Sequence, residues 1–397
     1  MRKLTADYIY TISGEVLENT VILLDKQGKI LSLDALNEHD SAGVERHEGV
    51  IVPGFINTHC HLELSHMKGK VATGTQLIPF ITNVVQFRDV PEEEIQAAID
   101  RADQEMYDGG IVAVGDISNK LDTAPRKRAS PIRYYTFVEM FDFLQDAGAE
   151  KCVADYRPVY DGQAQADGNR RSAVPHAPYS VSSRLFGLIN ELNQGQGTVS
   201  IHNQETPPEN ELFESKTGDF LGFYDGFNIP LDDFKATNKT AIHYALQHMD
   251  PRCRSLFVHN TLSTPADITA AQQWGQNGVY WATCANANLY IENRLPNYQH
   301  FLEADAKMTI GTDSLTSNWQ LSVLAEMQTI QRYQSYVPFA TLLQWATLNG
   351  AEALQFDQDL GSIEVGKTPG INLLTNLVGD KPENFAFGQR TEVKRVC

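Results

Sequence analysis

The chain has 397 residues, of which 42% are hydrophobic and 21% charged, so it can bury a large core in water. Its formal net charge of −18 argues against nucleic acid or an anionic membrane as the main partner, because both would repel it. No apolar run approaches the roughly 18 residues that cross a bilayer. The first residues lack the apolar core of a signal peptide, so we expect a cytoplasmic protein with five reduced, scattered cysteines.

Short strand-like runs separated by turns occur at both ends of the chain. They cover residues 8–12, 20–24 and 30–33 near the start, and residues 361–367 and 370–376 near the end. Neither group can bury much apolar surface alone. We therefore expect residues 1–50 and 356–397 to pair into one small β-sandwich domain built from both termini.

Strand and helix patterns alternate through the middle, residues 51–355. Expected helices cover residues 92–107, 182–193, 239–249 and 265–275. An open doubly wound sheet would alternate in the same way, but eight repeats that mostly end in polar residues favour a closed barrel. We predict an α/β fold, a (β/α)8 TIM-like barrel, with strands at 51–61, 110–116, 132–139, 172–176, 198–202, 255–259, 278–284 and 307–313.

Two connections between these elements are unusually long. Residues 205–237 are aromatic and rich in glycine, and we expect them to cap the site. Residues 120–131 carry Arg126, Lys127 and Arg128, which we interpret as a solvated run of charge.

Residues that can bind a metal stand at the ends of several predicted strands. His59 and His61 are two positions apart, so a strand directs both side chains to the same face. His202, His259 and Asp313 each close a later apolar run. Buried imidazoles and carboxylates are costly unless they are paired or bind a metal, so the set predicts a metal site at the barrel rim.

These residues belong to motifs that resemble the signature series of the amidohydrolase superfamily, at 53–61 (PGFINTHCH), 202–205 (HNQE), 258–260 (VHN) and 311–314 (GTDS). The resemblance is closest to its chlorohydrolase and cytosine-deaminase-like branch, which includes adenosine-type and aminofutalosine deaminases. It implies one divalent metal ion, zinc first and iron or manganese as alternatives, held by His59, His61, His202 and Asp313. The metal lowers the pKa of a bound water so that hydroxide is available at neutral pH.

The resemblance also implies catalytic roles. Glu205 would shuttle a proton to the ring nitrogen, His259 would hydrogen-bond the attacking water, and Asp313 would take up its proton. The implied enzyme is a metal-dependent aminohydrolase that acts on carbon–nitrogen bonds other than peptide bonds and releases ammonia. Relatives with such a site can expel chloride or open a cyclic amide or imidazolone, so these reactions are alternatives. A non-catalytic scaffold of the same fold is a remote one.

The motif at 176–180 (HAPYS) occupies the place where binuclear relatives carry a bridging lysine, which disfavours a second metal. His176 resembles a histidine that contacts substrate in the deaminases, with a purely structural role as the alternative. Asn288 is expected at the rim, where it would contact the substrate or orient His259.

The expected partner is a small heterocyclic substrate, for example a 5′-modified adenosine such as aminodeoxyfutalosine, and the chain would act alone or as a homodimer. Related methylthioadenosine deaminases carry a ribose-binding glutamate about where Pro79 stands here, which favours the aminofutalosine type. Arg88 could then receive a substrate carboxylate, as could Lys68 and Lys70, although solvated surface charge is the alternative for each.

Overall fold

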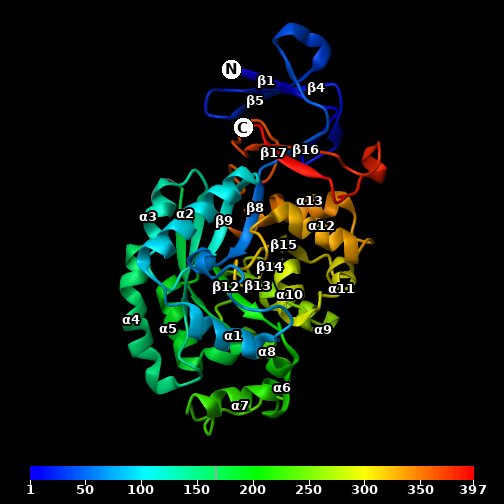
Figure 1. Cartoon of the computed structure of the whole chain (residues 1–397). Helices are drawn as coiled ribbons and strands as arrows, with labels where there is room; N and C mark the ends of the chain where they lie inside the picture. The colour runs from blue at the N-terminus through cyan, green and yellow to red at the C-terminus, as the bar shows by residue number, and fades with distance from the viewer. Residues whose placement is uncertain (166–167) are drawn as a thin grey trace.

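The computed structural model describes residues 1–165 and 168–397. Strands from the two ends of the chain lie together in two small sheets, and both termini lie in this part of the molecule (Figure 1). One sheet has the order β5-β4-β1-β6 and contains β1 (Arg2–Thr5), β4 (Thr20–Leu24), β5 (Ile30–Ala35) and β6 (Glu45–Arg46). The other has the order β17-β16-β7-β2-β3 and contains β2 (Tyr8–Tyr10), β3 (Val16–Leu17), β7 (Val50–Pro53), β16 (Ile371–Thr375) and β17 (Glu392–Arg395). The antiparallel pairing of β16 with β7 joins the two chain ends.

The first long apolar run is divided at Gly54 into β7, in the terminal sheet, and β8 (Phe55–Cys60). We expected one continuous strand beginning at residue 51, so this part of the prediction is wrong. A Cβ atom at Gly54 would lie 2.3 Å from Cγ1 of Val112 and 2.7 Å from the carbonyl oxygen of Pro369. Only glycine allows the backbone to approach so closely while it passes from one sheet to the next. The terminal sheet therefore reaches three residues beyond the boundary expected at residue 50.

The middle of the chain contains two parallel four-stranded sheets, and every strand predicted there is present. The first has the order β11-β10-β9-β8, with β9 (Ile111–Ile117), β10 (Arg133–Met140) and β11 (Arg170–Pro175). The second has the order β12-β13-β14-β15 and contains β12 (Thr198–Asn203), β13 (Arg254–His259), β14 (Val279–Thr283) and β15 (Lys307–Ile310). Their outer strands also meet: a parallel bridge joins Cys60 to Asp313, and the amide of His202 donates to the carbonyl of His176 at 2.9 Å.

Helices follow the strands along the chain and surround them in space (Figure 1). The four predicted helices are confirmed as α2 (Glu92–Asp108), α5 (Ser183–Asn193), α8 (Ala241–His248) and α9 (Pro265–Trp274). Local signals define two of these starts, because Ser182 caps α5 and a capping box of Thr264 and Asp267 begins α9. The other α-helices are α1 (Leu77–Phe87), α3 (Ala124–Ala129), α4 (Ala149–Gly162), α6 (Pro207–Ser215), α7 (Asp219–Gly226), α10 (Ala285–Glu292), α11 (Tyr298–Glu303), α12 (Val323–Tyr333), α13 (Phe339–Ala346) and α14 (Leu348–Ala353).

The parallel strands form the core of the molecule. Every residue of β8, β9 and β12 is buried, as expected where helices cover one face and other strands pack against the opposite face. Trp281, Phe257 and Met308 are among the fully buried side chains of this core. The rigid core fixes the carboxyl ends of the strands, where the polar residues stand. No helix in the described parts of the chain has both the length and the apolar character to cross a membrane.

The segment that we interpreted as a solvated run of charge is folded and partly buried. Residues 124–129 form α3, in which Lys127 is only 2% exposed. Its Nζ lies 2.5 Å from Oδ2 of Asp116 and donates to the hydroxyls of Ser118 and Thr136. Asp116 also accepts the backbone amide of Leu62, directly after His61. The interpretation was wrong for Lys127, because burial here depends on a partner from another element, which local charge density does not reveal. Arg128 is exposed as expected, and Arg126 is partly buried.

Lys127→Met should lower the free energy of unfolding by about 3–5 kcal/mol, because it leaves the carboxylate of Asp116 buried without its cation. Urea denaturation measures this change. Lys151→Met is the matched control, since Lys151 is paired with Asp155 on α4 but its side chain is 79% exposed. A surface pair of this kind contributes at most about 1 kcal/mol. Equal effects of the two substitutions would contradict the buried role of Lys127.

The long connection after β12 is not an irregular loop, because it contains α6 and α7. Phe223 of α7 reaches the cavity described below. The expectation that this connection lies over the site is therefore confirmed for α7.

Candidate active site

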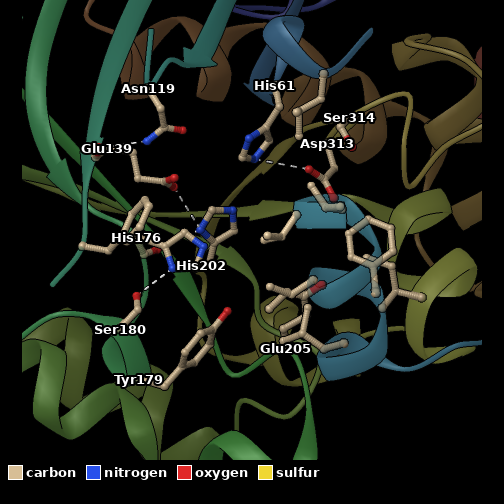
Figure 2. Close-up of a pocket in the computed structure, with 18 of the residues that line it drawn as sticks. His61, Asn119, Glu139, His176, Tyr179, Ser180, His202, Glu205, Asp313 and Ser314 are labelled. Atoms are coloured by element: carbon tan, nitrogen blue, oxygen red, sulfur yellow. Dashed lines mark hydrogen bonds and ion pairs between the residues drawn. The ribbon is translucent and has the colours of Figure 1, made fainter. Parts of the chain in front are cut away.

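The four residues predicted to bind a metal come together at the carboxyl ends of three strands. His59 and His61 come from the end of β8, His202 from β12, and Asp313 from the segment after β15. Ligand atoms of the three histidines all lie within 4.8 Å of one another. Oδ1 of Asp313 is 3.4 Å from Nε2 of His61 and 3.8 Å from Nε2 of His59. Figure 2 shows His61, His202 and Asp313 directed toward a common point.

Neighbouring groups orient these side chains. Nδ1 of His202 hydrogen-bonds the carbonyl of His176 at 2.8 Å, which leaves Nε2 free. Oδ2 of Asp313 accepts the hydroxyl of Ser317 at 2.7 Å, which leaves Oδ1 facing the histidines. Such partners orient metal ligands in proteins of known mechanism.

The fully buried Asn57 links the two chain segments that carry the ligands. Its Oδ1 accepts the backbone amides of His59 at 3.4 Å and Thr312 at 3.1 Å. The sequence analysis did not single out Asn57. Its place two residues before His59 on a strand was the available signal, since alternate residues share a face.

The donor set fits one divalent cation. Burial, followed by repulsion from neighbouring histidines, lowers the pKa of His59 and of His202 well below the ordinary value. These rings are therefore neutral at pH 7, the form that binds metal. Nε2 of His59 lies only 3.2 Å from Nε2 of His61. Two lone pairs at that distance are stabilised by a shared cation, and three nitrogens with one carboxylate oxygen suit zinc.

The backbone is strained at two of the predicted site residues. His259 has a φ of 72° and Asp313 a φ of 57°, values that are uncommon for residues other than glycine. Gly311 makes the second bend feasible, because a Cβ there would lie 2.8 Å from Cβ of His59. Strain of this kind persists where surrounding structure enforces it, and it is concentrated at functional sites.

Glu205 is buried at the edge of the metal cluster, where its Oε2 lies 3.6 Å from Nε2 of His259. Burial, and then the nearby Asp313, raises its pKa well above the ordinary value. A second buried glutamate, Glu209, holds the bend before it, because its carboxylate accepts the amides of Gln204 and Glu205 at 3.0 Å each. Glu205 can therefore carry a proton at neutral pH in a fixed position.

Asn288 lies behind His259 and not on the cavity wall. It is fully buried, and its Oδ1 is 2.8 Å from Nδ1 of His259. Of the two roles expected for Asn288, this position fits the one in which Asn288 orients His259. This contact places the His259 proton on Nδ1 and leaves Nε2 as an acceptor toward Glu205 and the ligands.

A cavity of about 200 Å³ opens onto these groups. Its floor is polar and contains His61, His202, Glu205, His259 and Asp313. Its outer wall is apolar. Helix α1 contributes Leu77, Phe80, Ile81, Val84 and Val85. The rest of this wall comes from Phe223 of α7, Ile291 of α10 and the loop residues Phe141, Phe143 and Tyr179. An apolar cleft with a few convergent polar groups is the usual form of a site for a small ligand.

Some of the residues predicted to contact the substrate line the cavity, and others do not. His176 lines the cavity, where its Nδ1 is 2.7 Å from the hydroxyl of Ser180. Arg88 also lines it, with Nη2 4.0 Å from Oε1 of Glu63. Lys68 and Lys70 are not among the lining residues, and Lys70 pairs with Glu94 at 3.7 Å.

Sequence analysis assigned no individual role to three further polar residues that line the cavity, Glu63, Asn119 and Glu139. Burial raises the pKa of Glu63 to about 7 and that of Glu139 to about 8. Glu139 also belongs, with His176 and His202, to a second group of ligand-capable atoms within 4.8 Å of one another. Its position near the end of a predicted strand, like that of His202, was the signal available in the sequence.

Comparison with known proteins agrees with this geometry. The family model described as "Amidohydrolase family" matches residues 50–396. An adenosine deaminase of Helicobacter pylori is 28% identical over 370 residues, which cover 90% of this chain and 88% of that protein.

Two solved structures share the fold. The crystal structure of H. pylori aminofutalosine deaminase in complex with methylthio-coformycin has a TM-score of 0.78 at 22% identity and covers 96% of this chain and 94% of that one. The atrazine chlorohydrolase of Arthrobacter aurescens TC1 complexed with zinc has a TM-score of 0.76 at 17% identity, with 98% and 93% covered.

Proposed function

The chain belongs to the amidohydrolase family, and we propose that it is a hydrolase that removes an amino group, as ammonia, from a heterocycle of adenosine type. The main support for this proposal is the position of Glu205, a buried acid with a raised pKa that lines the same cavity as the proposed metal ligands. Such an acid can protonate a ring nitrogen while water attacks the adjacent carbon. The adenosine and aminofutalosine deaminases among its relatives support the choice of substrate class.

The fold that we propose is a closed (β/α)8 barrel with a small β-sandwich domain beside it. The contacts between β8 and β15, and between β11 and β12, support closure of the two parallel sheets. The barrel would comprise residues 51–355 as expected from the sequence, less β7, which pairs in the terminal sheet. The sandwich would comprise residues 1–50 with β7 and residues 356–397. A barrel of this type carries its active site at the carboxyl ends of its strands.

His59, His61, His202 and Asp313 would hold one divalent cation, zinc in the first place and iron or manganese as alternatives. When bound, such a cation supplies a water molecule that is acidified enough to ionise near neutral pH. Ser317 and the carbonyl of His176 would keep the ligands aligned through the hydrogen bonds to Asp313 and His202.

The residues around the cation would divide the proton transfers among them. Oδ1 of Asp313 takes a proton from the attacking water, and Nε2 of His259 accepts a hydrogen bond from it, since its Nδ1 hydrogen is committed to Asn288. Glu205 donates its proton to the ring nitrogen and so makes the adjacent carbon electrophilic. The proton taken up by Asp313 then passes to the amino group, the carbon–nitrogen bond breaks, and ammonia leaves. The remaining hydroxyl proton of the added water passes to the carboxylate of Glu205, which restores the acid and leaves a ring carbonyl behind.

The cavity suits a planar ring held between its polar floor and its apolar outer wall. His176 would contact the ring, and Arg88 at the wall would meet a substrate carboxylate, as in a substrate of the aminodeoxyfutalosine kind. The shared fold with a zinc-containing chlorohydrolase keeps dechlorination as the second candidate reaction.

Purified protein should contain about one metal ion per chain and should release ammonia from at least one of adenosine, 5′-deoxyadenosine, methylthioadenosine and aminodeoxyfutalosine. Elemental analysis and a coupled ammonia assay measure the two quantities. Atrazine serves as the comparison substrate, with chloride as the readout. Release of chloride from atrazine, without ammonia from any nucleoside, would replace deamination by dechlorination as the proposed reaction. Release of neither ammonia nor chloride would indicate a non-catalytic scaffold.

A further inference from the structure

Two glutamates of the cavity, Glu63 and Glu139, take no part in the reaction described above. Glu139 lies on the opposite side of His202 from Glu205 (Figure 2), and both glutamates line the same cavity as the metal ligands. Each is only 4% exposed. Carboxylates are rarely buried to this extent without partners that compensate them.

The partners of Glu63 are present in the protein. Its Oε2 accepts the backbone amide of Asn119 at 2.9 Å, and its Oε1 lies 4.0 Å from the guanidinium of Arg88. Glu139 is different, because its buried Oε1 has no hydrogen-bond partner among residues 1–165 and 168–397. That atom is 3.5 Å from Nδ1 of His202, but this nitrogen already bonds the carbonyl of His176 at 2.8 Å. The side chain of Asn119 donates to the backbone carbonyl of Glu139. Its hydrogen bonding also offsets part of the rise that burial causes in the pKa of Glu139, but Oε1 still has no donor.

A buried acceptor that lacks a donor is costly, and proteins seldom retain one without a function. The unpartnered oxygen is itself buried, but it belongs to a residue that lines the cavity, so a molecule bound against this wall could supply the missing donor. Glu63 adds a second carboxyl group nearby, and Arg88 brings opposite charge to the pair. Anionic groups are therefore disfavoured at this place, and groups with O–H or N–H bonds are favoured.

We propose that Glu139, flanked by Glu63, is a specificity-determining residue that accepts a hydrogen bond from a hydroxyl or ammonium group of the substrate. This inference rests on the proposed function for the identity of the ring, and it adds the chemical class of the substituent. The donor group would lie on the His176 side of the cavity while the reacting carbon faces Glu205 and Asp313. Arg88, at the outer wall, stays available for a separate acidic group.

A second cation held by Glu139, His176 and His202 is the competing explanation of the free oxygen. His202 already faces the first set of ligands, and its Nδ1 hydrogen is used by a backbone carbonyl. Nδ1 of His176 is likewise paired with Ser180. A second ion at this place would have to break one of these bonds or share His202, so the donor group is the better occupant.

The test measures ligand binding separately from turnover. Calorimetric titration uses zinc-loaded proteins that all carry Glu205→Gln, so that the ligands are not consumed. It compares adenosine with 2′,3′-dideoxyadenosine, which lacks the 2′ and 3′ hydroxyls, with 5′-deoxyadenosine, which lacks the 5′ hydroxyl, and with 5′-amino-5′-deoxyadenosine, which offers an ammonium group. The variants are Glu139→Gln and, as a control, Asp142→Asn. Asp142 is a buried carboxylate three residues away that bonds Ser182 and does not line the cavity.

At least one donor deletion should weaken binding tenfold or more in the Glu205→Gln protein and in its Asp142→Asn variant, and less than threefold in its Glu139→Gln variant. The melting temperature of ligand-free Glu139→Gln should not fall below that of the wild type, because the substitution removes an uncompensated buried carboxylate. Four results would each overturn the inference. They are equal affinities for all ligands, no binding, an unchanged ligand preference in Glu139→Gln, and two metal ions per wild-type chain. If the enzyme releases ammonia but binds all ligands equally, the proposed function holds and this inference fails. If it prefers ligands with the donor group but releases no ammonia, this inference holds and the proposed function fails.

Discussion

Glu205→Gln should lower kcat for deamination by about 10²–10⁴-fold while the protein keeps close to one metal ion per chain. The amide has nearly the shape of the carboxyl group but cannot donate the proton that the ring nitrogen needs. Metal content should be unchanged because Glu205 belongs to neither cluster of ligand atoms, and its carboxylate lies 3.6 Å from Nε2 of His259, which is not one of the proposed ligands. Steady-state ammonia release and elemental analysis on the same sample measure both quantities.

Glu214→Gln is the matched control, because Glu214 lies on α6 of the same connection and is exposed. It should keep wild-type kcat. Loss of metal in Glu205→Gln would instead make Glu205 a ligand, and retention of more than about a tenth of the activity would remove it as the proton donor.

Asp313→Ala should lose both the metal ion and the activity. The carboxylate lies 3.4 Å from Nε2 of His61 and 3.8 Å from that of His59. Its removal leaves the cation with neutral imidazole ligands and no negatively charged ligand. The proposed acceptor of the water proton disappears as well. We expect at least a 10⁴-fold fall in kcat/KM, the upper end of the effect of one acid–base group, because two functions are lost together. Elemental analysis and the ammonia assay again measure the result.

Heat denaturation separates metal binding from a general loss of structure. A ligand that binds only the folded state raises its melting temperature, so a chelator should lower that of the wild type and should not change that of Asp313→Ala. Ser317→Ala gives a graded comparison, because it removes only the hydrogen bond to Oδ2 of Asp313. It should weaken metal affinity by about 10–100-fold. An Asp313→Ala protein that retains one tightly bound ion would contradict the assignment.

Prediction from sequence succeeded for elements whose pattern is local. Most of the eight parallel strands contain an apolar run that ends in polar residues, as in β12, and two of the predicted helices, α5 and α9, begin with a side-chain cap. The metal-capable residues were found for the same reason, because each one closes such a run.

Prediction failed where a residue depends on a partner that is far away in the chain. Lys127 lies among other cations in the sequence, but its burial is determined by Asp116 on β9 and Thr136 on β10. The break at Gly54 depends on Val112 and Pro369, which no local pattern connects with it. For Asn288 the sequence left two roles open, and only the fold shows that its side chain lies against His259.

The sequence alone was enough to predict the eight strands of the middle, four of the helices between them, the polar residues at the strand ends and the resemblance to the amidohydrolases. The tertiary structure decided which of these polar groups have partners. It showed that Glu63 bonds the amide of Asn119, that Glu139 keeps one oxygen without a donor, and that Glu205 is buried beside His259. The physical reason is that hydrogen bonding and desolvation depend on distances between groups from different strands, and these distances exist only after the chain has folded.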